Sequence, residues 1–348
     1  MPRGPCNAGT DKKRIEIGKA LNRRGRATHA NRTMSIYLEQ LTLRLATGAD
    51  RFPAARRQRH RDFLRSAQNP DGGFSGREGG SDLYYTGFAL RGLALVEGMG
   101  EETAARAAQF LRSRLSHAVP MIDLLSLLYG AAVLKQAAGI DPLAAAGADW
   151  QDRVAEVLAQ LRRDDGGFAK TPNSPQSSTY YTFLAMIAAE LIDRPITVSP
   201  RMVSMVQSRR RDDGGFVEFP AVTRSATNPT AAAVAILKRG DALDLATRRG
   251  VVRQLAAMQT GEGGLRANTR IPVADLLSTF TGLLTLVDLE ATAEIDMAAL
   301  ERYAESLEHA DGGFHAAAWD QHRDVEYTFY GLGTLALLAP LGDPLPGG

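Results

Sequence analysis

A pair of glycines that returns at a fixed spacing constrains this chain more than any other feature. The first glycines of the pairs are Gly72, Gly166, Gly214, Gly263 and Gly312, so the gaps are 94, 48, 49 and 49 residues. Because 94 is close to twice 47, one unit has lost its glycines, and its helix survives in the stretch 123–129, which is similar to 275–280. A period of this size predicts a repeat architecture of six units of roughly 48 residues.

Two helices are expected in each unit. The segment before a glycine pair is amphipathic, as in 61–68, whereas the segment after it is apolar almost all round, as in 87–95. An apolar stripe with a charged back is typical of an outer helix, and an apolar surface all round is typical of a buried one. The glycines supply the positive φ at which the outer helix ends, and the apolar residue after them is expected to fill the space between units. The sequence predicts an all-α (α/α)6 toroid of helical hairpins.

Composition fits one large closed domain, since 44% of the 348 residues are hydrophobic. Residues 1–33 hold nine Lys/Arg and two Asp/Glu, a charge of +7, which leaves 32 minus 37, or −5, on the remainder. This basic extension lacks apolar periodicity and is expected to be disordered. The patterned sequence begins at Met34, which is a candidate for the true start, and an Arg-rich targeting peptide is the alternative. The predicted domains are therefore 1–33 and 34–348.

Several classes of protein are excluded by what the sequence lacks. The uneven charge is no nucleic-acid signature by itself, and no apolar run reaches the roughly 18–20 residues of a membrane span. No secretory signal opens the chain, so a cytoplasmic location is expected. The only cysteine is Cys6, which excludes a disulfide or a cysteine nucleophile in the folded body.

The repeat resembles a known one. The stretch Gln68-Asn-Pro-Asp-Gly72-Gly-Phe74 is similar to the Gln-x-x-x-Gly-x-Trp motif of the prenyltransferase and squalene-cyclase repeat family, with Phe in place of Trp, and 259–265 is a weaker copy. Spacing is closest to the β subunits of protein farnesyl- and geranylgeranyltransferases, over about residues 50–340. The resemblance implies an (α/α)6 toroid whose central cavity holds an isoprenoid, and a helical α-type partner subunit.

The resemblance also implies a zinc site, held in the family by an Asp-x-Cys pair and a His. Here Asp275 retains the aspartate, Leu277 replaces the cysteine and Tyr327 replaces the histidine. One carboxylate does not make a zinc site, so the predicted site is degenerate and transfer activity stays open. A replacement site of Asp275, His322 and Asp324 is a further hypothesis, as is Mg²⁺ holding a diphosphate.

Candidate ligand-binding residues follow from the expected ring, because one face of every inner helix looks into the centre. Aromatic residues gather in the first turns of these helices, and about half must simply pack. The candidates to line the cavity are Tyr85, Tyr181, Phe280, Tyr327 and Tyr330. Helix dipoles favour an anion at the same mouth, and Arg266 and Arg270 are candidates to bind it, unless they are solvated surface. The small residues of 230–237 leave space for a long apolar ligand.

The function predicted from the sequence is a prenyltransferase β-subunit-like protein that binds an isoprenoid diphosphate, or another apolar small molecule, in a central cavity. A non-catalytic binding or scaffold toroid is one alternative. A terpene cyclase-like enzyme is another, although the Asp-x-Asp-Asp motif of cyclases is missing. A carbohydrate-active α/α toroid would need two carboxylates across the cavity. The candidates share one register and also suit helix capping: Asp82, Asp123, Asp275 and Asp324.

Overall fold

The computed structural model describes residues 37–115 and 120–339. The chain divides into two compact units, residues 1–40 and 41–348, and the described part of the first is the opening turn of α2 (Tyr37–Ala49). The predicted extension 1–33, its expected disorder and the candidate start at Met34 lie outside the described residues.

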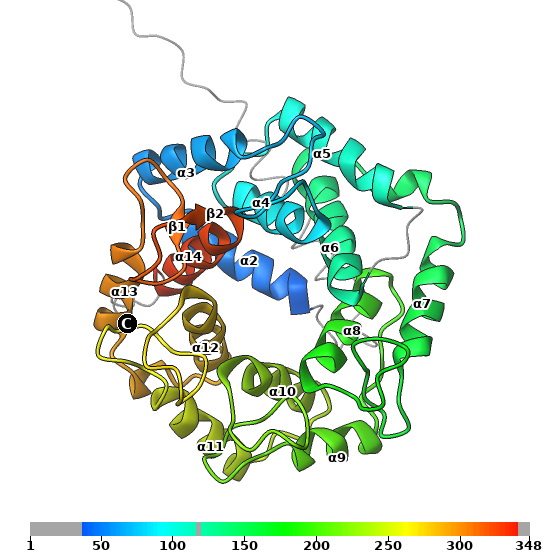
Figure 1. The fold of residues 1–348 in the computed structure, drawn as a ribbon, viewed down its shortest axis with the longest axis vertical. Helices are drawn as coiled ribbons and strands as arrows, with labels where there is room; N and C mark the ends of the chain where they lie inside the picture. The colour runs from blue at the N-terminus through cyan, green and yellow to red at the C-terminus, as the bar shows by residue number, and fades with distance from the viewer. Residues whose placement is uncertain (1–36, 116–119, 340–348) are drawn as a thin grey trace, which may run out of the picture. The chain divides into compact units, whose positions relative to one another are not determined.

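Helices of the second unit alternate between an inner and an outer layer (Figure 1). The inner helices are α4 (Leu83–Leu95), α6 (Met121–Ala138), α8 (Thr179–Leu191), α10 (Thr227–Arg239), α12 (Leu276–Asp288) and α14 (Val325–Leu338). The outer helices are α3 (Ala54–Ser66), α5 (Glu101–Arg114), α7 (Trp150–Leu161), α9 (Pro200–Ser208), α11 (Leu245–Ala256) and α13 (Met297–Ser306). Short elements complete the fold: η1 (Pro142–Ala145), η2 (Thr292–Glu294), β1 (Phe314–His315) and β2 (Arg323–Asp324), with β1 and β2 antiparallel.

The inner layer is closed on itself. Each inner helix packs against the next in chain order, and α14 packs against α4. A closed ring has no terminal unit with an exposed apolar face, so every inner helix can be apolar on nearly all sides. The prediction of an α/α toroid is confirmed.

The first glycine of each pair packs directly against the outer helix of the following repeat. Gly214 has φ +93°, and a Cβ added there would lie well inside contact with the carbonyl of Gly250 in α11. The Asp213 carboxylate accepts the Gly215 N–H at 3.0 Å, and the Phe216 N–H donates to Thr230 Oγ at 2.9 Å. Phe216 is fully buried. The predicted positive φ and the predicted apolar plug are both confirmed, and both follow from the close approach of neighbouring repeats.

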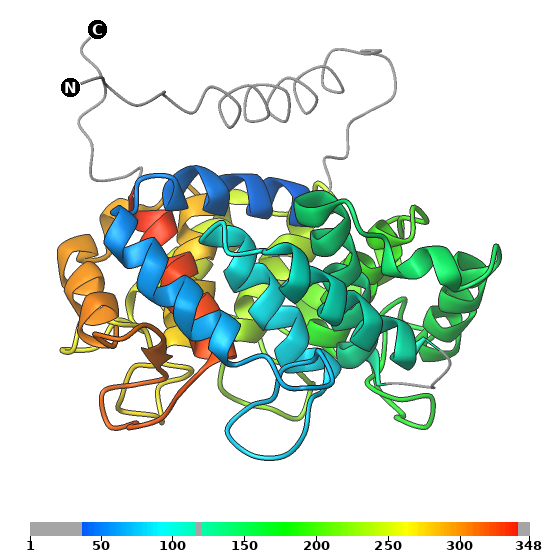
Figure 2. The same cartoon turned by 90° about the horizontal axis from the view of Figure 1, so that it is seen from above.

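From Leu41 onward, α2 crosses the end of the ring opposite the long loops (Figure 2). Arg44 pairs with Asp288 at the end of α12 at 2.6 Å, and the Thr42 hydroxyl lies 3.0 Å from the Tyr129 hydroxyl of α6. Gly48 lies directly against the backbone of Ala336 in α14. These contacts reach three inner helices, so α2 covers this end of the ring while the other end faces the loops.

Within the described residues, one helix is long and apolar enough to cross a membrane by length and composition alone, namely α6. It packs between α4 and α8 and buries residues along its whole length, including Leu127 and Leu134. Its apolar composition is therefore explained by its place in the inner layer.

Candidate functional site

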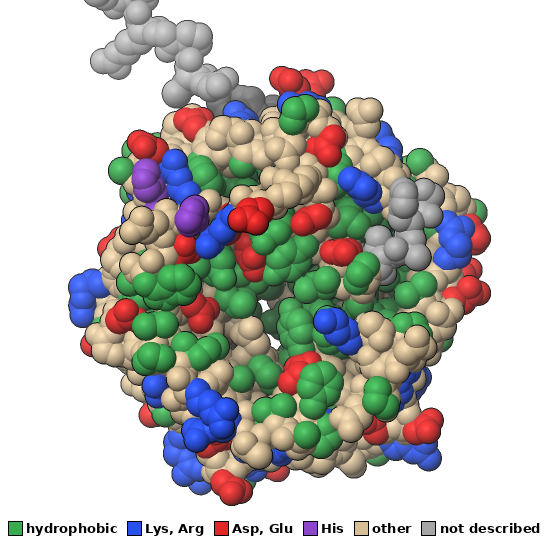
Figure 3. Space-filling model, in the orientation of Figure 1, with side chains coloured by type: hydrophobic (Ala, Val, Ile, Leu, Met, Phe, Trp, Pro, Cys, Tyr) green, Lys and Arg blue, Asp and Glu red, His purple; other side chains and the backbone are tan. Residues whose placement is uncertain are grey.

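The centre of the ring is hollowed on the face that carries the long loops (Figure 3). Hydrophobic side chains surround the hollow, and acidic side chains lie near its rim. The inner helices begin on this face, so residues of their first turns form the rim and residues further along face the interior.

An aromatic wall runs across three neighbouring inner helices. The Phe88 ring of α4 lies 5.6 Å from Phe329 and 5.1 Å from Tyr330 on α14. The Phe280 ring of α12 lies 5.7 Å from Phe329 and 5.5 Å from Tyr330. Offset and edge-on rings at such distances bury a large apolar surface and hold one another in place. The wall is therefore preformed, and packing leaves each of its four rings at most 9% exposed.

The structure brings some of the predicted cavity residues together and separates others. Phe280 and Tyr330 belong to the aromatic wall, and the Tyr327 ring lies 6.2 Å from Tyr330. Tyr85 packs instead against Gly76 in the rim loop. Tyr181 comes one position after Tyr180, which is the residue of α8 that faces the interior. A shift of one residue turns a side chain by about 100° around a helix, so these two tyrosines point to a different face from Tyr84 and Tyr180.

Tyr84 and Tyr180 face the interior and were not among the cavity residues predicted from the sequence. Tyr84 shares one face of α4 with Phe88 and Arg91, because they are four and seven residues apart. Burial raises the pKa of Tyr180 to about 12, and charges on both α4 and α14 also act on it, so the α8 side chain points across the ring. The helical phase of Phe88 was the signal that would have found Tyr84.

Glu326 is a further inward-facing residue that the sequence analysis missed. It lies in the first turn of α14, is 8% exposed, and accepts a hydrogen bond from the Tyr84 hydroxyl at 2.6 Å. Burial raises the pKa of this carboxyl to about 7, and the Asp324 charge adds to the effect, against the Tyr84 hydrogen bond. Glu326 can therefore hold or release a proton near neutral pH.

Arg91 brings a permanent positive charge into the same interior. Its guanidinium lies 3.9 Å from the Phe88 ring centre, 4.7 Å from Phe329 and 5.0 Å from Tyr129. These rings belong to α4, α14 and α6, so the charge sits among the inner helices. This position could not be predicted from the sequence, because a single arginine in an apolar helix is as often surface as interior.

Each of the predicted metal ligands interacts with a different partner, and the three do not meet at one point. Asp275 accepts the Ser278 N–H at 2.7 Å and the Ser278 hydroxyl at 2.8 Å, whereas Asp324 accepts from Arg77 Nε at 3.0 Å. The acid nearest His322 is Asp320, at 3.8 Å. Across the part of the chain that the structure describes, no three His, Cys, Asp or Glu side chains converge as metal ligands would. Asp275 with Leu277 and Tyr327 does not offer the donors that zinc takes.

Helix capping explains three of the four aspartates in the shared register. Asp82, Asp275 and Asp324 are the N-caps of α4, α12 and α14, and each accepts a backbone N–H three residues on. The expectation that Asp123 also begins its helix is wrong. Pro120 is the N-cap of α6, and Asp123 lies inside the first turn, because α6 begins earlier than the other inner helices.

The arginines predicted to bind an anion lie in the loop before α12. Arg266 donates to the carbonyl of Ala257, just beyond the outer helix α11, at 3.2 Å. Arg270 is exposed in the same loop. Arg266 is thus directed to the outer layer. The hydrogen bonds that position the Asp275 carboxylate come from Ser278 and not from either arginine.

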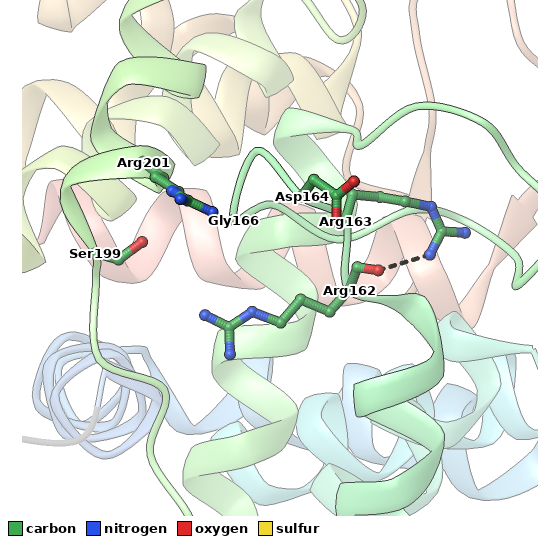
Figure 4. A pocket seen from close by; sticks show the side chains of 6 residues that line it. All are labelled: Arg162, Arg163, Asp164, Gly166, Ser199 and Arg201. Carbon is green, nitrogen blue, oxygen red and sulfur yellow. Dashed lines mark hydrogen bonds between the residues drawn. The ribbon is translucent and has the colours of Figure 1, made fainter.

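A second hollow, of about 480 Å³, opens on the outer layer between the end of α7 and the start of α9 (Figure 4). It is lined by Arg162, Arg163, Asp164, Gly166, Ser199 and Arg201. The Arg163 guanidinium braces the neighbouring loop by donating to the carbonyls of Thr171 and Pro172. Arg162 and Arg201 are exposed to solvent.

Comparison with known proteins agrees with this architecture. Residues 16–264 and 230–343 match the model of the prenyltransferase alpha-alpha toroid domain. A variant of the type II terpene cyclase MstE from Scytonema, in complex with geranylgeranyl dihydroxybenzoate, is similar with a TM-score of 0.58 at 14% identity, over 87% of this chain and 99% of that one. Protein geranylgeranyltransferase-I from Candida albicans, complexed with GGPP, is similar with a TM-score of 0.59 at 16% identity, over 81% and 90%.

At these identities the solved structures show the fold alone. A search of curated protein sequences finds no match. The family model spans most of the described helices, including the aromatic wall and both ends of the closed ring. The chain therefore belongs to the prenyltransferase alpha-alpha toroid domain family.

Proposed function

We propose that the protein binds an isoprenoid chain, as its diphosphate or a related derivative, in the central cavity, in the manner of a prenyltransferase β subunit. The observation that carries this proposal is the aromatic wall of Phe88, Phe280, Phe329 and Tyr330. Each methylene that leaves water for such a surface contributes about 0.8 kcal/mol. The similar terpene cyclase and geranylgeranyltransferase were both solved with geranylgeranyl compounds, which supports this ligand class.

Space for a long chain lies opposite the wall. In the closed ring of inner helices, α10 is the third helix after α4 and therefore lies opposite it. Ala231 and Ala235 keep exposed surface although they belong to an inner helix, whereas Ala232, Ala233 and Val234 are buried. Being four residues apart, Ala231 and Ala235 share one face of the helix. Beyond Asn228, which shares this face in the first turn, the inward face of α10 is lined by the methyl groups of Ala231 and Ala235.

Filling this space tests the proposal without altering the wall. Ala235→Trp is expected to weaken binding of geranylgeranyl diphosphate, measured by titration calorimetry, by about tenfold or more, which corresponds to roughly 1.4 kcal/mol. Ala159→Trp, at an exposed position on the outer helix α7, serves as the matched control and should bind like the parent. A parent protein that binds no isoprenoid would leave the scaffold alternative in place, and unchanged binding by Ala235→Trp would put the ligand elsewhere.

Zinc-dependent transfer is not part of the proposal, because the residues at the family position do not fit the metal. The helical α-type subunit that the resemblance implies stays a prediction. The aromatic wall is built from inner helices of this chain, so the proposed binding does not require a partner.

A terpene cyclase-like activity is the second candidate, and Glu326 is the observation that favours it. A protonated carboxyl beside the cavity can donate its proton to an alkene carbon, which gives a carbocation and a carboxylate. Ring closure moves the positive charge along the chain, and loss of a proton from the cyclic carbocation to the carboxylate gives the neutral product and restores the acid, so atoms and charge balance. A pKa of about 7 keeps the proton on Glu326 below neutral pH but makes the group a weak acid toward an alkene. Binding without cyclisation is therefore proposed first.

Product analysis decides between the two candidates. If Glu326 is the acid, cyclised products from a geranylgeranyl substrate, detected by gas chromatography and mass spectrometry, should decline as pH rises through 7 and vanish in Glu326→Gln. Glu294→Gln, at an exposed position on η2, is the control. Cyclised product from Glu326→Gln would exclude this residue as the acid.

A further inference from the structure

We propose that the ligand of the central cavity carries an anionic group, a carboxylate or a phosphate, and that this group is bound by Arg91 in the depth of the cavity and not at its rim. The inference rests on the proposed function and names the polar end of the isoprenoid ligand. It also gives the direction in which the ligand lies.

The position of Arg91 is fixed by the rings around it. Its guanidinium stands over Phe88 of its own helix and is flanked by Tyr129 and Phe329 from the two neighbouring inner helices. Tyr129 is held in turn by the Thr42 hydroxyl of α2, which covers that end of the ring. Arg91 lies eight residues beyond the start of α4, or about 12 Å along the helix axis. The charge is thus well below the rim.

This charge has no ion-pair partner among the described residues, although the Glu326 carboxylate lies within range of its field, since Arg91 acts to lower the pKa of Glu326. Over residues 37–115 and 120–339, Arg91 has no carboxylate at ion-pair distance, and its one hydrogen bond runs from Nε to the Gly87 carbonyl at 3.0 Å. Four of the five guanidinium N–H groups are left for other partners. Three aromatic faces offset part of the cost of desolvating a cation, at about 0.5–2 kcal/mol each, but they satisfy none of these donors. Arg91 keeps accessible surface although inner helices surround it, so the open side faces the cavity.

The rim, by contrast, already holds negative groups where an anion would otherwise bind. A helix N-terminus attracts a phosphate through its free N–H groups and its dipole. At α4, α12 and α14, the carboxylates of Asp82, Asp275 and Asp324 accept N–H groups of the first turn. Arg77, the cation beside α14, is paired with Asp320 and Asp324. A second anion at this rim would meet like charge, so the ligand's anion is better placed at Arg91.

The geometry around Arg91 suits an oxyanion. A carboxylate or a phosphate accepts two parallel hydrogen bonds from the guanidinium edge, while the apolar chain lies along Phe88, Phe329 and Tyr330. Glu326 lies nearer the rim on α14 and is hydrogen-bonded to Tyr84, so Arg91 acts on it through space and not through an ion pair. The ligand would therefore enter with its anionic end first and direct its chain toward the rim and the alanine face of α10.

The experiment compares ligands that share one chain and differ only in the end group. Binding of geranylgeranoic acid, geranylgeranyl diphosphate and geranylgeraniol to the full chain is measured by calorimetry at one pH. The parent should bind one or both acidic ligands about tenfold or more tightly than the alcohol. Arg91→Met should remove this preference while changing the affinity for the alcohol by less than about threefold, and Arg91→Lys should keep part of it.

Two other arginines make the test specific. Arg270→Met removes the rim-loop arginine that the sequence analysis proposed for the anion, and Arg253→Met removes an exposed arginine of the outer helix α11. Both should keep the preference for an acidic end. The lysine variant carries the test if the methionine variant does not fold.

Each outcome has a separate meaning. Preference for the carboxylate over the diphosphate, or the reverse, identifies the source of the anion and supports the inference in either case. Equal binding of the alcohol and both acids by the parent would overturn the role of Arg91 but leave isoprenoid binding intact. Loss of the preference in Arg270→Met, with its retention in Arg91→Met, would place the anion at the rim. Failure of all three ligands to bind the parent would reject the proposed function itself.

Discussion

Glu308→Gln is expected to lower the free energy of unfolding by about 3 kcal/mol, since it removes one partner of a buried group of charges. The Glu308 side chain is 6% exposed and follows the last outer helix, α13. It accepts hydrogen bonds from Arg56, Arg59 and His60, all on the first outer helix, α3. These contacts join the last repeat to the first, so the variant weakens the seam at which the ring closes.

The matched control is Glu305→Gln. Glu305 pairs with Arg56 at 3.0 Å, yet its side chain is 46% exposed, so its loss is expected to cost less than about 1 kcal/mol. Urea denaturation followed by circular dichroism measures both variants against the parent. Equal losses for Glu305→Gln and Glu308→Gln would show that burial of the seam contributes nothing.

Low pH is expected to weaken the contacts of Glu308 at the same seam. Burial alone would raise the pKa of Glu308, but hydrogen bonds from His60 and Arg56 outweigh it and hold the pKa at about 2. Because this folded value lies below the roughly 4.3 of an unfolded glutamate, the contribution of Glu308 is complete above pH 4.3 and is lost as pH falls toward 2. Glu308→Gln should therefore lose less stability than the parent between pH 5 and 3.

His60 should add to the acid sensitivity. Its Nδ1 accepts the Gly313 N–H at 3.0 Å, so the folded ring is neutral and carries its proton on Nε2, toward Glu308. Burial lowers the pKa of this ring. Its stabilising contribution is present above about pH 6.5, the unfolded value, and declines as pH falls below it.

Gly312→Ala is expected to destabilise the protein by about 2–5 kcal/mol. A left-handed backbone costs a residue with a Cβ about 1–2 kcal/mol, and Gly312 has φ +87°. The added Cβ would also collide with the carbonyl of Arg59 in α3, and overpacking of this kind costs about a further 1–3 kcal/mol. Thermal and urea denaturation measure the loss.

Gly79→Ala separates the two causes. Gly79 has φ +86°, close to that of Gly312, but no heavy atom lies within 4 Å of the position of an added Cβ. This control should therefore show the conformational cost alone, about 1–2 kcal/mol. If both alanine variants lose the same stability, the close approach of Gly312 to α3 does not contribute to ring closure.

The fold could be predicted from the sequence because its causes are local and repeated. A helix with one apolar stripe must lie outside, and a helix apolar all round must lie inside. The first glycine has positive φ in each of the five units that keep the pair, and the apolar residue after the pair is buried each time, as Phe74 and Phe314 are. Each copy of the motif predicts the same local structure, so the loss or misreading of one copy does not change the predicted fold.

The site could be predicted only in part, because it depends on which way single side chains turn. Phe280 and Tyr330 were found by their position in a first turn, whereas Tyr84 and Glu326 depend on the phase of their helices relative to the ring axis. Arg91 gains its meaning from rings on α6 and α14, which are 38 and 238 residues away, at Tyr129 and Phe329. No local sequence pattern predicts a contact between residues so far apart in the chain.

The sequence by itself determined the toroid, its glycine turns and the N-caps of three inner helices, since each follows from residue type and spacing. Only the tertiary structure decided that the rim carboxylates bind their own helices, that Glu326 is buried against Tyr84, and that Arg91 lies unpaired among aromatic rings. The physical reason is that charge and burial at the cavity are set by side chains that converge from different repeats, and their distances are fixed only when the ring closes.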